Sequence, residues 1–147
     1  MFRVASLDER DRLFEIWHDA VKATHHFLDD AAFNEIADLV RDKYLPSKDF
    51  LVFVDGTDVP LGFMGTTAGE VESLFIDPKH FGKGIGKAFI NHMKSHHAEV
   101  RLEVNEQNPQ AVGFYEACGF SVVRRDPTDD HGRPFPILHM VWTRPNS

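Results

Sequence analysis

A glycine-rich turn between two different periodic patterns constrains this chain most. Before the turn, Val71–Ile76 is short and rich in β-branched and aromatic residues, which is typical of a strand. After it, apolar and histidine residues recur at helical spacing over 85–96. The turn itself contains Gly82, Gly84 and Gly86. The sequence therefore predicts a strand, a glycine-rich turn and a helix start, in that order.

This arrangement predicts an anion site. The first N–H groups of a helix have no partner within the helix, and the helix dipole favours negative charge beside them. Glycines let a phosphate approach the backbone because no Cβ intervenes. The chain is acidic, with 16 Lys and Arg against 23 Asp and Glu, yet 78–98 contains lysines and no acidic residue. A basic segment in an acidic protein favours a phosphate ligand over general nucleic-acid binding; a solvated basic helix face is the alternative.

Two common phosphate loops do not fit the glycine spacing. A Walker loop needs four residues between its glycines and a hydroxyl after the lysine, whereas three residues separate Gly82 from Gly86, and Ala88 takes the hydroxyl position. A dinucleotide fingerprint needs a third glycine where Phe89 stands. The pattern that remains is Gly-x-Gly running into a helix. It resembles the acyl-CoA pyrophosphate loop of the GNAT N-acetyltransferases, Arg/Gln-x-x-Gly-x-Gly/Ala.

Gly84 and Gly86 match that family pattern, whereas Phe81 replaces its usual Arg or Gln. This departure affects one side-chain contact and does not change the backbone groups that would bind the phosphate. The alternative is a turn that needs flexible glycines but binds no phosphate. The resemblance implies acetyl-CoA as cosubstrate, bound by the strand end, the turn, the helix start and the next motif. The expected cofactor-binding residues are Leu74, Phe75, Ile76, Phe81, Gly82, Lys83, Gly84, Ile85, Gly86, Lys87, Asn108 and Tyr115.

A second segment, 108–120, resembles the GNAT pattern N-x-x-A-x-x-x-Y-x-x-x-G-F at matching spacing. Asn108 and Pro109 also open a helix well, as N-cap and first helical residue, and Gly119 suits its end. The resemblance implies that Tyr115 lies near the acyl-CoA sulfur and donates a proton to the leaving thiolate. A tyrosine that only packs on the sheet is the alternative.

Glu103 is the leading candidate for the catalytic base. Its strand alternates, with Val100, Leu102 and Val104 on one face and Glu103 on the other. An amine with a pKa of about 10.4 is mostly protonated at pH 7, so exposing its lone pair costs about 4–5 kcal/mol. A positioned acid or base contributes about 10²–10⁴-fold. Related acetyltransferases carry a glutamate here; a salt-bridged surface carboxylate is the alternative.

Histidines supply further candidates. The resemblance places the loop after the first helix beside the acceptor pocket, so His25 and His26 are expected substrate-binding residues, with surface histidines as the alternative. His92 and His96 are spaced as a metal pair, but Met93 replaces the glutamate of H-E-x-x-H and no third ligand is evident, so no metal is predicted.

The polar loop 126–134 would form the other wall of the pocket, and its acidic residues suit a cationic acceptor. Cys118 is the one cysteine, which excludes an intramolecular disulfide and fits a reducing compartment. Nothing near Cys118 activates it, so direct transfer is expected rather than an acyl-enzyme.

The expected fold is α/β (α+β): a GNAT fold with a mixed, mostly antiparallel seven-stranded sheet flanked by four helices, as a single domain over 1–147. The length suits one domain, and a hydrophobic content of 42% is ordinary. The predicted strands and helices follow the order β-α-α-β-β-β-α-β-α-β-β. The expected strands are 1–5, 50–54, 61–67 (broken by Gly62 and Gly65), 71–76, 100–105, 120–123 and 135–142. The first expected helix is capped by Ser6 or Asp8 and has its apolar stripe over 13–21, and the other helices are expected over 30–43, 85–96 and 108–118.

The expected activity is acetyl-CoA-dependent transfer of an acetyl group directly to an amine, small-molecule or peptide. A non-catalytic acyl-CoA-binding or sensor domain is the alternative, because a sensor needs the loop but not the Tyr115–Glu103 pair. Neither a signal peptide nor a membrane span is evident, so a cytoplasmic protein without membrane or nucleic-acid partners is expected. The acceptor and the oligomeric state, including a homodimer, stay open.

Overall fold

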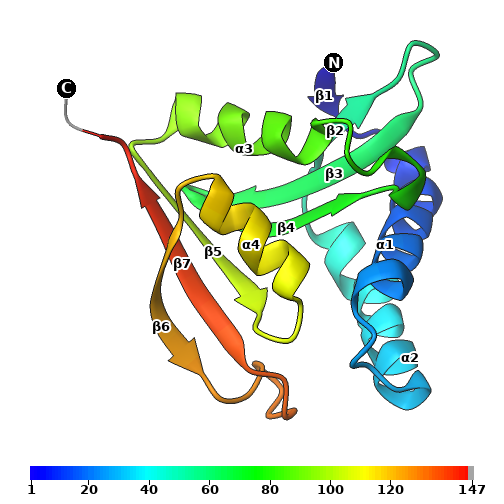
Figure 1. Cartoon of the computed structure of the whole chain (residues 1–147). Coiled ribbons are helices and arrows are strands. Elements are labelled where there is room, and N and C mark those ends of the chain that lie inside the picture. The colour runs from blue at the N-terminus through cyan, green and yellow to red at the C-terminus, as the bar shows by residue number, and fades with distance from the viewer. Residues whose placement is uncertain (146–147) are drawn as a thin grey trace. The chain divides into compact units, whose positions relative to one another are not determined.

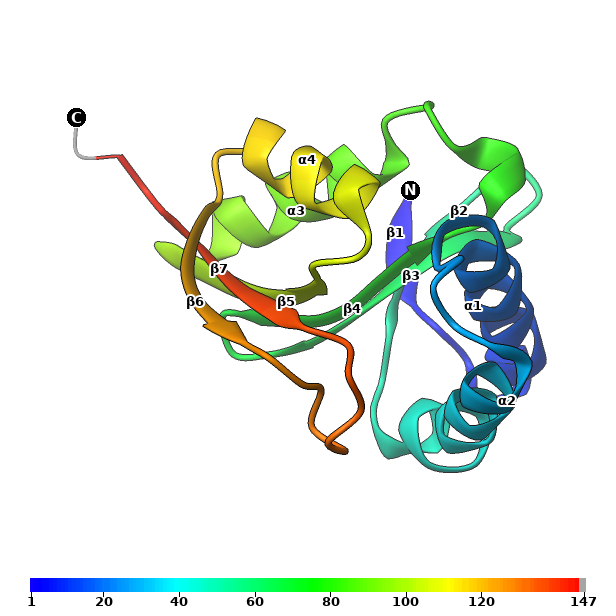
Figure 2. The same cartoon turned by 60° about the horizontal axis from the view of Figure 1, so that its bottom comes forward.

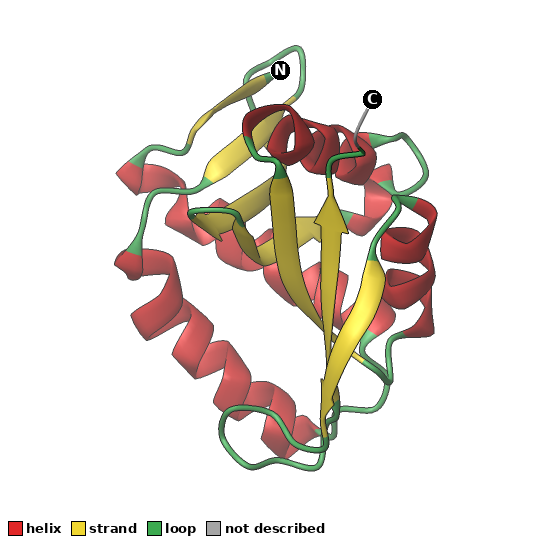
Figure 3. Ribbon diagram, turned by 90° about the vertical axis from the view of Figure 1, so that its left-hand side faces the viewer, coloured by secondary structure: helices red, strands yellow, loops and turns green. Residues whose placement is uncertain are grey.

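The structure is a computed structural model that describes residues 1–145. The described chain, drawn in Figure 1, divides by its internal contacts into two compact units. The first comprises Met1–Gly65 and Ser73–Phe89; the second comprises Thr66–Glu72 and the chain from Ile90 onward. Helices and strands are joined by loops in both (Figure 3).

Antiparallel strands begin the sheet in the first unit. β1 (Phe2–Val4) pairs with β2 (Leu51–Val54), and β2 pairs with β3 (Pro60–Thr67). β4 (Glu70–Ile76) follows after a tight turn. The strands predicted over 1–5, 50–54 and 71–76 are confirmed, with ends that shift by one residue.

Two helices lie side by side in the first unit (Figure 2). α1 (Arg10–Thr24) follows a 3₁₀ turn in which the Glu9 carboxylate accepts the Ser6 N–H at 2.9 Å. α2 (Asp30–Leu39) is capped by Asp29, whose carboxylate accepts the Ala32 N–H at 2.7 Å. The predicted second helix therefore begins as expected, but continues past α2 as a π-helical turn over Val40–Tyr44 and a 3₁₀ turn over Leu45–Ser47.

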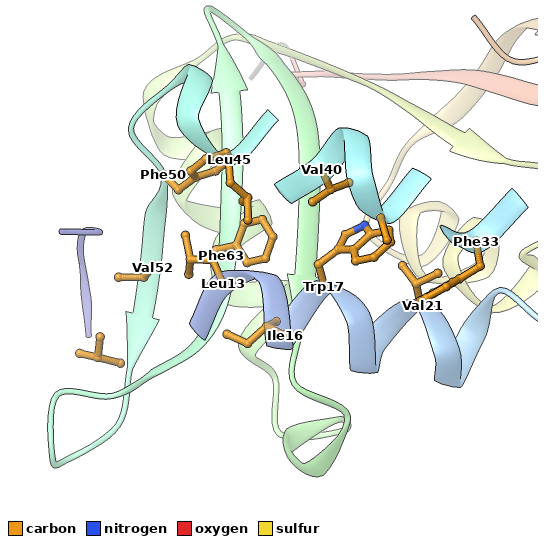
Figure 4. Close-up of a cluster of buried hydrophobic side chains, with 12 residues drawn as sticks. Leu13, Ile16, Trp17, Val21, Phe33, Val40, Leu45, Phe50, Val52 and Phe63 are labelled. Carbon is orange, nitrogen blue, oxygen red and sulfur yellow. The ribbon is translucent and has the colours of Figure 1, made fainter. Parts of the chain in front are cut away.

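The apolar faces of these helices and strands form one buried cluster (Figure 4). Trp17 of α1 stacks on Phe33 of α2 with ring centroids 5.4 Å apart, and Phe50 meets Phe63 edge to face. Burying each such side chain stabilises the fold by about 1.5–3 kcal/mol, so this cluster accounts for much of the stability of the first unit. Its members are Leu13, Ile16, Trp17, Val21, Phe33, Ala37, Val40, Leu45, Phe50, Val52, Val54 and Phe63.

The prediction that two glycines break β3 is wrong, because β3 is continuous. A Cβ at Gly62 would lie 2.7 Å from Ile76 Cδ1, and one at Gly65 would lie 2.5 Å from the Tyr44 hydroxyl and 2.8 Å from Ser73 Oγ. The hydroxyls of Tyr44 and Ser73 are hydrogen-bonded at 2.7 Å. The glycines therefore permit close packing against a strand, rather than ending it.

In the second unit, β7 (Ile137–Thr143) lies between β5 (Glu99–Asn105) and β6 (Ser121–Asp126) and is antiparallel to both (Figure 1). β5 pairs in parallel with the start of β4. The strand order β1-β2-β3-β4-β5-β7-β6 thus combines antiparallel pairs with the parallel pair of β4 and β5. With the helices α3 (Ile85–His96) and α4 (Pro109–Ala117), this confirms the predicted element order, sheet and fold class.

The predicted two faces of β5 are also confirmed. Val100, Leu102 and Val104 are buried, whereas Glu103 is on the other face. Within residues 1–145, no helix combines the length and apolar character that a membrane span requires. The prediction of a single domain over 1–147 stays a prediction.

Candidate active site

The glycine-rich turn of the first unit connects the 3₁₀ turn Pro78–His80 to α3. Gly82 and Gly84 have φ of +78° and +81°, in the left-handed region that favours glycine. Among residues 1–145, no heavy atom outside each glycine and its two chain neighbours lies within 4 Å of a Cβ built there. The Ala88 N–H donates to the Gly84 carbonyl at 3.0 Å as the first bond of the helix. The N–H groups before it are therefore available to an anion, as the predicted pyrophosphate cradle requires.

A buried ion pair fixes the entry to this turn. Asp77, at the end of β4, is 5% exposed and pairs with the Arg12 guanidinium at 2.9 Å. Its other oxygen accepts the Lys79 N–H at 3.0 Å. Burial raises the pKa of Asp77, but the hydrogen bonds from Arg12 and Lys79 outweigh it and hold the pKa below the usual value. Sequence reasoning missed the role of Arg12, since its partner is far away in the chain.

Lysines rather than Phe81 carry the positive charge of the turn. Phe81 is 40% exposed and offers no cation where the family pattern has Arg or Gln. Lys83 Nζ lies 3.1 Å from His80 Nδ1, and Lys79 and Lys87 are exposed. Ile85 is buried, and Gly86 is half-buried in the first turn of α3.

The expected cofactor-binding strand end is also in the first unit. Leu74, Phe75 and Ile76 are half-buried on β4. Between β4 and β5, Glu70 pairs with Arg101 and Val71 pairs with Leu102. Leu74, Phe75 and Ile76 lie beyond these pairs on β4. Their backbone is thus suited to pair with an extended ligand.

In the second unit, Glu103 contacts a histidine that sequence reasoning missed. Glu103 Oε1 lies 3.3 Å from Nδ1 of His139, which is directly opposite on β7. His139 Nε2 lies 2.7 Å from Asp126 Oδ2 on β6. Burial raises the pKa of Glu103; His139 lowers it, whereas Asp130, Glu70 and Asp126 raise it further. The glutamate is thus a carboxylate of increased proton affinity within an acidic surrounding.

Tyr115 lies on α4, and Asn108 is the residue just before this helix. The Tyr115 ring meets Phe114 and Phe120 with centroids 5.2 and 5.8 Å away. Among residues 1–145, no group forms a hydrogen bond with the Tyr115 hydroxyl. Burial raises the pKa of Tyr115, so the phenol keeps its proton at neutral pH. Asn108 is 6% exposed, and its side-chain oxygen caps α4 by accepting the Ala111 N–H at 3.2 Å.

The two predicted substrate histidines differ in character. His25 is half-buried, its Nδ1 lies 2.8 Å from the Thr24 hydroxyl, and its ring packs on Phe27. Burial, and secondarily the charge of His26, lowers the pKa of His25 to about 4. His25 is therefore neutral at pH 7, whereas His26 is exposed.

The remaining candidates have structural partners. The rings of His92 and His96 lie 4.4 Å apart, and no group of three potential metal ligands was found within residues 1–145. Asp129 shapes its own loop, since one of its oxygens accepts the N–H groups of His131 and Arg133. Asp130 is the exposed acid of this loop.

The structure thus assembles the predicted residues in two groups. The turn, the β4 end and the two substrate histidines belong to the first unit, and Glu103, Asn108 and Tyr115 to the second. No hydrogen bond or ion pair joins Glu103 to Tyr115 within residues 1–145. The missed His139 had one sequence signal, which is its position between buried Leu138 and Met140, on the alternate face of a strand.

Comparisons with known proteins agree with this geometry. A family model described as an acetyltransferase (GNAT) domain matches residues 17–143. The peptidyl-lysine N-acetyltransferase YjaB of Salmonella typhimurium is 42% identical over 135 residues, covering 92% of this chain and 92% of that protein. The peptidyl-lysine N-acetyltransferase YiaC of Escherichia coli is 32% identical over 124 residues, covering 84% of each.

A solved structure gives the same result. The solution structure of apo-form YjaB from Escherichia coli matches with a TM-score of 0.93 at 39% identity, and the match covers 99% of this chain and 98% of that one. The chain therefore belongs to the GNAT acetyltransferase family, and it is an N-acetyltransferase that uses acetyl-CoA as its cosubstrate.

Proposed function

We propose that this enzyme acetylates the ε-amino group of lysine residues in proteins or peptides. Two relatives with this activity in their names, YjaB and YiaC, align with 84–92% of the chain. The acidic surrounding of Glu103 carries the proposal within the structure. Three other carboxylates raise the pKa of Glu103, and such a negative region favours a cationic lysine side chain as it approaches.

In the proposed mechanism, acetyl transfer is direct. The neutral amine nitrogen attacks the thioester carbonyl carbon, Glu103 takes the proton that the amine loses, and the C–S bond breaks. The thiolate then takes the hydroxyl proton of Tyr115. The Tyr115 hydroxyl supports this role because, among residues 1–145, no group forms a hydrogen bond with it, and the phenol carries its proton at neutral pH.

The backbone N–H groups of the turn are proposed to bind the acetyl-CoA pyrophosphate. The positive φ values of Gly82 and Gly84 and the basic residues Lys83 and Lys87 support this role. Asn108, whose oxygen is used in the helix cap, is left with its amide N–H groups for the cofactor. His25 and His26 are proposed to contact the acceptor, His25 as a neutral group.

A panel of acceptors tests the substrate class. Purified enzyme and acetyl-CoA are incubated with a lysine-containing peptide blocked at its N-terminus, the same peptide with arginine in place of lysine, spermidine and an aminoglycoside. Coenzyme A release and peptide mass are followed. Acetylation of the lysine peptide but not of the arginine control supports the proposal. Faster transfer to a small polyamine than to any peptide would contradict it, and acetyl-CoA binding without transfer to any acceptor would favour the sensor alternative.

Two substitutions test the catalytic roles. Glu103→Gln should lower kcat by about 10²-fold, with a deficit that shrinks as pH rises, because the free amine becomes more abundant. Tyr115→Phe should lower kcat by a similar factor, about 10²-fold, without changing acetyl-CoA affinity, since only the hydroxyl is removed. Unchanged pH dependence in the first variant, or full activity in the second, would contradict the respective role.

The wider setting is proposed as well. A single catalytic domain over 1–147 acts in the cytoplasm, and the lone Cys118 fits a reducing compartment. The exposed Val122 and Val123 on β6 support self-association as a homodimer. Light scattering of the purified protein decides between monomer and dimer.

A further inference from the structure

His139 lies among charged side chains of the second unit. It is 17% exposed, and three charged side chains surround it. Nδ1 lies 3.3 Å from Glu103 Oε1, whereas Nε2 lies 2.7 Å from Asp126 Oδ2 and 3.1 Å from Arg124 Nη2. Glu103 of β5, His139 of β7, and Asp126 and Arg124 of β6 thus form a continuous row of polar groups.

The contacts determine where the ring carries its hydrogen. A carboxylate only accepts hydrogen bonds, so the short Asp126 contact requires a hydrogen on Nε2. Arg124 then pairs with the Asp126 carboxylate, 3.6 Å away, rather than donating to the same nitrogen. In the neutral ring Nδ1 therefore presents a lone pair toward Glu103.

A lone pair that faces a carboxylate is unfavourable unless a proton lies between them. Glu103 and His139 can accommodate one shared proton, either as a carboxylic acid that donates to Nδ1 or as an imidazolium that donates to the carboxylate. The imidazolium form is stabilised by a carboxylate on each side, Glu103 and Asp126. The pair is thus arranged to take up a proton from outside.

We propose that His139 is the positioning residue for Glu103, and that it takes over the proton which Glu103 removes from the acceptor amine. The inference rests on the proposed role of Glu103 as base. The amine N–H bond breaks as an O–H bond forms on Glu103, and that proton then moves to Nδ1. Asp126 balances the positive charge of the ring until the proton passes to solvent. No redox partner or further reactant is needed.

The surroundings of the pair favour proton uptake. The charged and titratable groups around Glu103 are Glu70 on β4, Arg101 on β5, Arg124 and Asp126 on β6, Asp130 in the following loop and His139 on β7. Arg101 lies within 4.0 Å of Glu99, and Arg124 pairs with Asp126, so both cations have carboxylate partners. The net field at Glu103 is therefore negative, which raises the pKa of Glu103 and so favours uptake of a proton.

Paired substitutions of His139 separate positioning from proton transfer. His139→Asn places an amide near the Nδ1 position, which can hold Glu103 but cannot take a proton, and His139→Ala removes both functions. Arg125→Gln is the matched control, because it breaks the exposed Arg125–Glu106 pair of β6 without touching the row. The rates kcat and kcat/KM are measured from pH 5 to 10 on the lysine peptide, together with acetyl-CoA affinity and thermal stability.

Both His139 variants should lose about tenfold or more in kcat while binding acetyl-CoA normally. The acid limb of their pH profiles should move to higher pH, because His139 lowers the pKa of Glu103, and without it burial and the neighbouring carboxylates act on that pKa unopposed. Glu103→Gln combined with His139→Asn should be no slower than Glu103→Gln alone, since both act in one path. The Arg125 control should keep the wild-type profile.

The outcomes distinguish the two proposals. If Glu103→Gln is slow but both His139 variants keep the wild-type acid limb and rate, the relay is wrong and the base role stands. An unaffected Glu103→Gln overturns the base role and the relay together. If His139→Asn matches wild type while only His139→Ala is slow, His139 positions Glu103 without taking its proton, and the transfer step is overturned.

Discussion

Replacing Gly84 with alanine tests whether the turn conformation itself binds acetyl-CoA. Gly84 has φ +81°, and in the part of the chain that the structure describes no heavy atom beyond its two chain neighbours lies within 4 Å of a Cβ built there. Alanine therefore meets no steric obstacle from neighbouring residues. Its one penalty is the left-handed backbone, which costs about 1–2 kcal/mol for a residue other than glycine.

The location of this penalty determines what the variant loses. Because Gly84 is exposed and its neighbours are distant, little in the free protein holds the turn against relaxing to negative φ. The free variant should relax and keep nearly wild-type stability. Acetyl-CoA must then restore the left-handed turn, so its affinity should fall by the same 1–2 kcal/mol, which corresponds to about 5–30-fold.

Isothermal titration calorimetry measures the affinity for acetyl-CoA. Urea unfolding in the absence of acetyl-CoA measures the free energy of unfolding. Gly56→Ala is the control, because it has no atom within 4 Å and no positive φ, and both its quantities should match wild type. Unchanged affinity in Gly84→Ala, with 1–2 kcal/mol lost from the free energy of unfolding, would show that the turn is rigid without ligand. No change in either quantity would refute the left-handed conformation of Gly84.

Three further predictions concern stability. The pKa of His25 is lowered to about 4, so below pH 6.5 the unfolded chain binds more protons than the native protein. The free energy of unfolding should therefore fall by up to about 3 kcal/mol from pH 6.5 to 4. In chemical denaturation, His25→Gln should lose less of its free energy of unfolding than the wild type over that pH range. Gly65→Ala should cost about 1–3 kcal/mol in urea unfolding, because the new Cβ meets the Tyr44 hydroxyl at 2.5 Å; wild-type stability would show that this site can expand. Asp77→Asn should cost about 1–2 kcal/mol, because Arg12 loses a charged partner, and an unchanged thermal midpoint would contradict the importance of that pair.

The element order could be predicted because each element has a local signal. The alternation over β5 is a property of seven consecutive residues, and the helix cap at Asn108 is set within four. The glycines of β3 were misinterpreted for a related reason. A glycine in a strand indicates either a break or a close neighbour, and the neighbours of Gly65 come from residues 44 and 73, which no local pattern connects.

The candidate site was predictable in part for the same reason. The residues expected from the two family motifs were chosen from patterns of six to thirteen positions, and the positive φ of Gly82 and Gly84 agrees with their proposed role. His139 carries no such pattern. Its significance depends on the register that places it opposite Glu103, and shifting β7 by one residue would put it on the buried face.

Phosphate binding and proton transfer therefore depend on the sequence in different ways. The proposed pyrophosphate cradle is made of backbone N–H groups, so it needs glycines at fixed spacing and does not depend on the side chain at Phe81, where the family pattern has Arg or Gln. The proposed proton path is made of side chains on three strands, so it needs a cross-strand register that pairs Glu103 with His139. Because register is set by the whole sheet, no short motif around Glu103 determines which side chain lies opposite it.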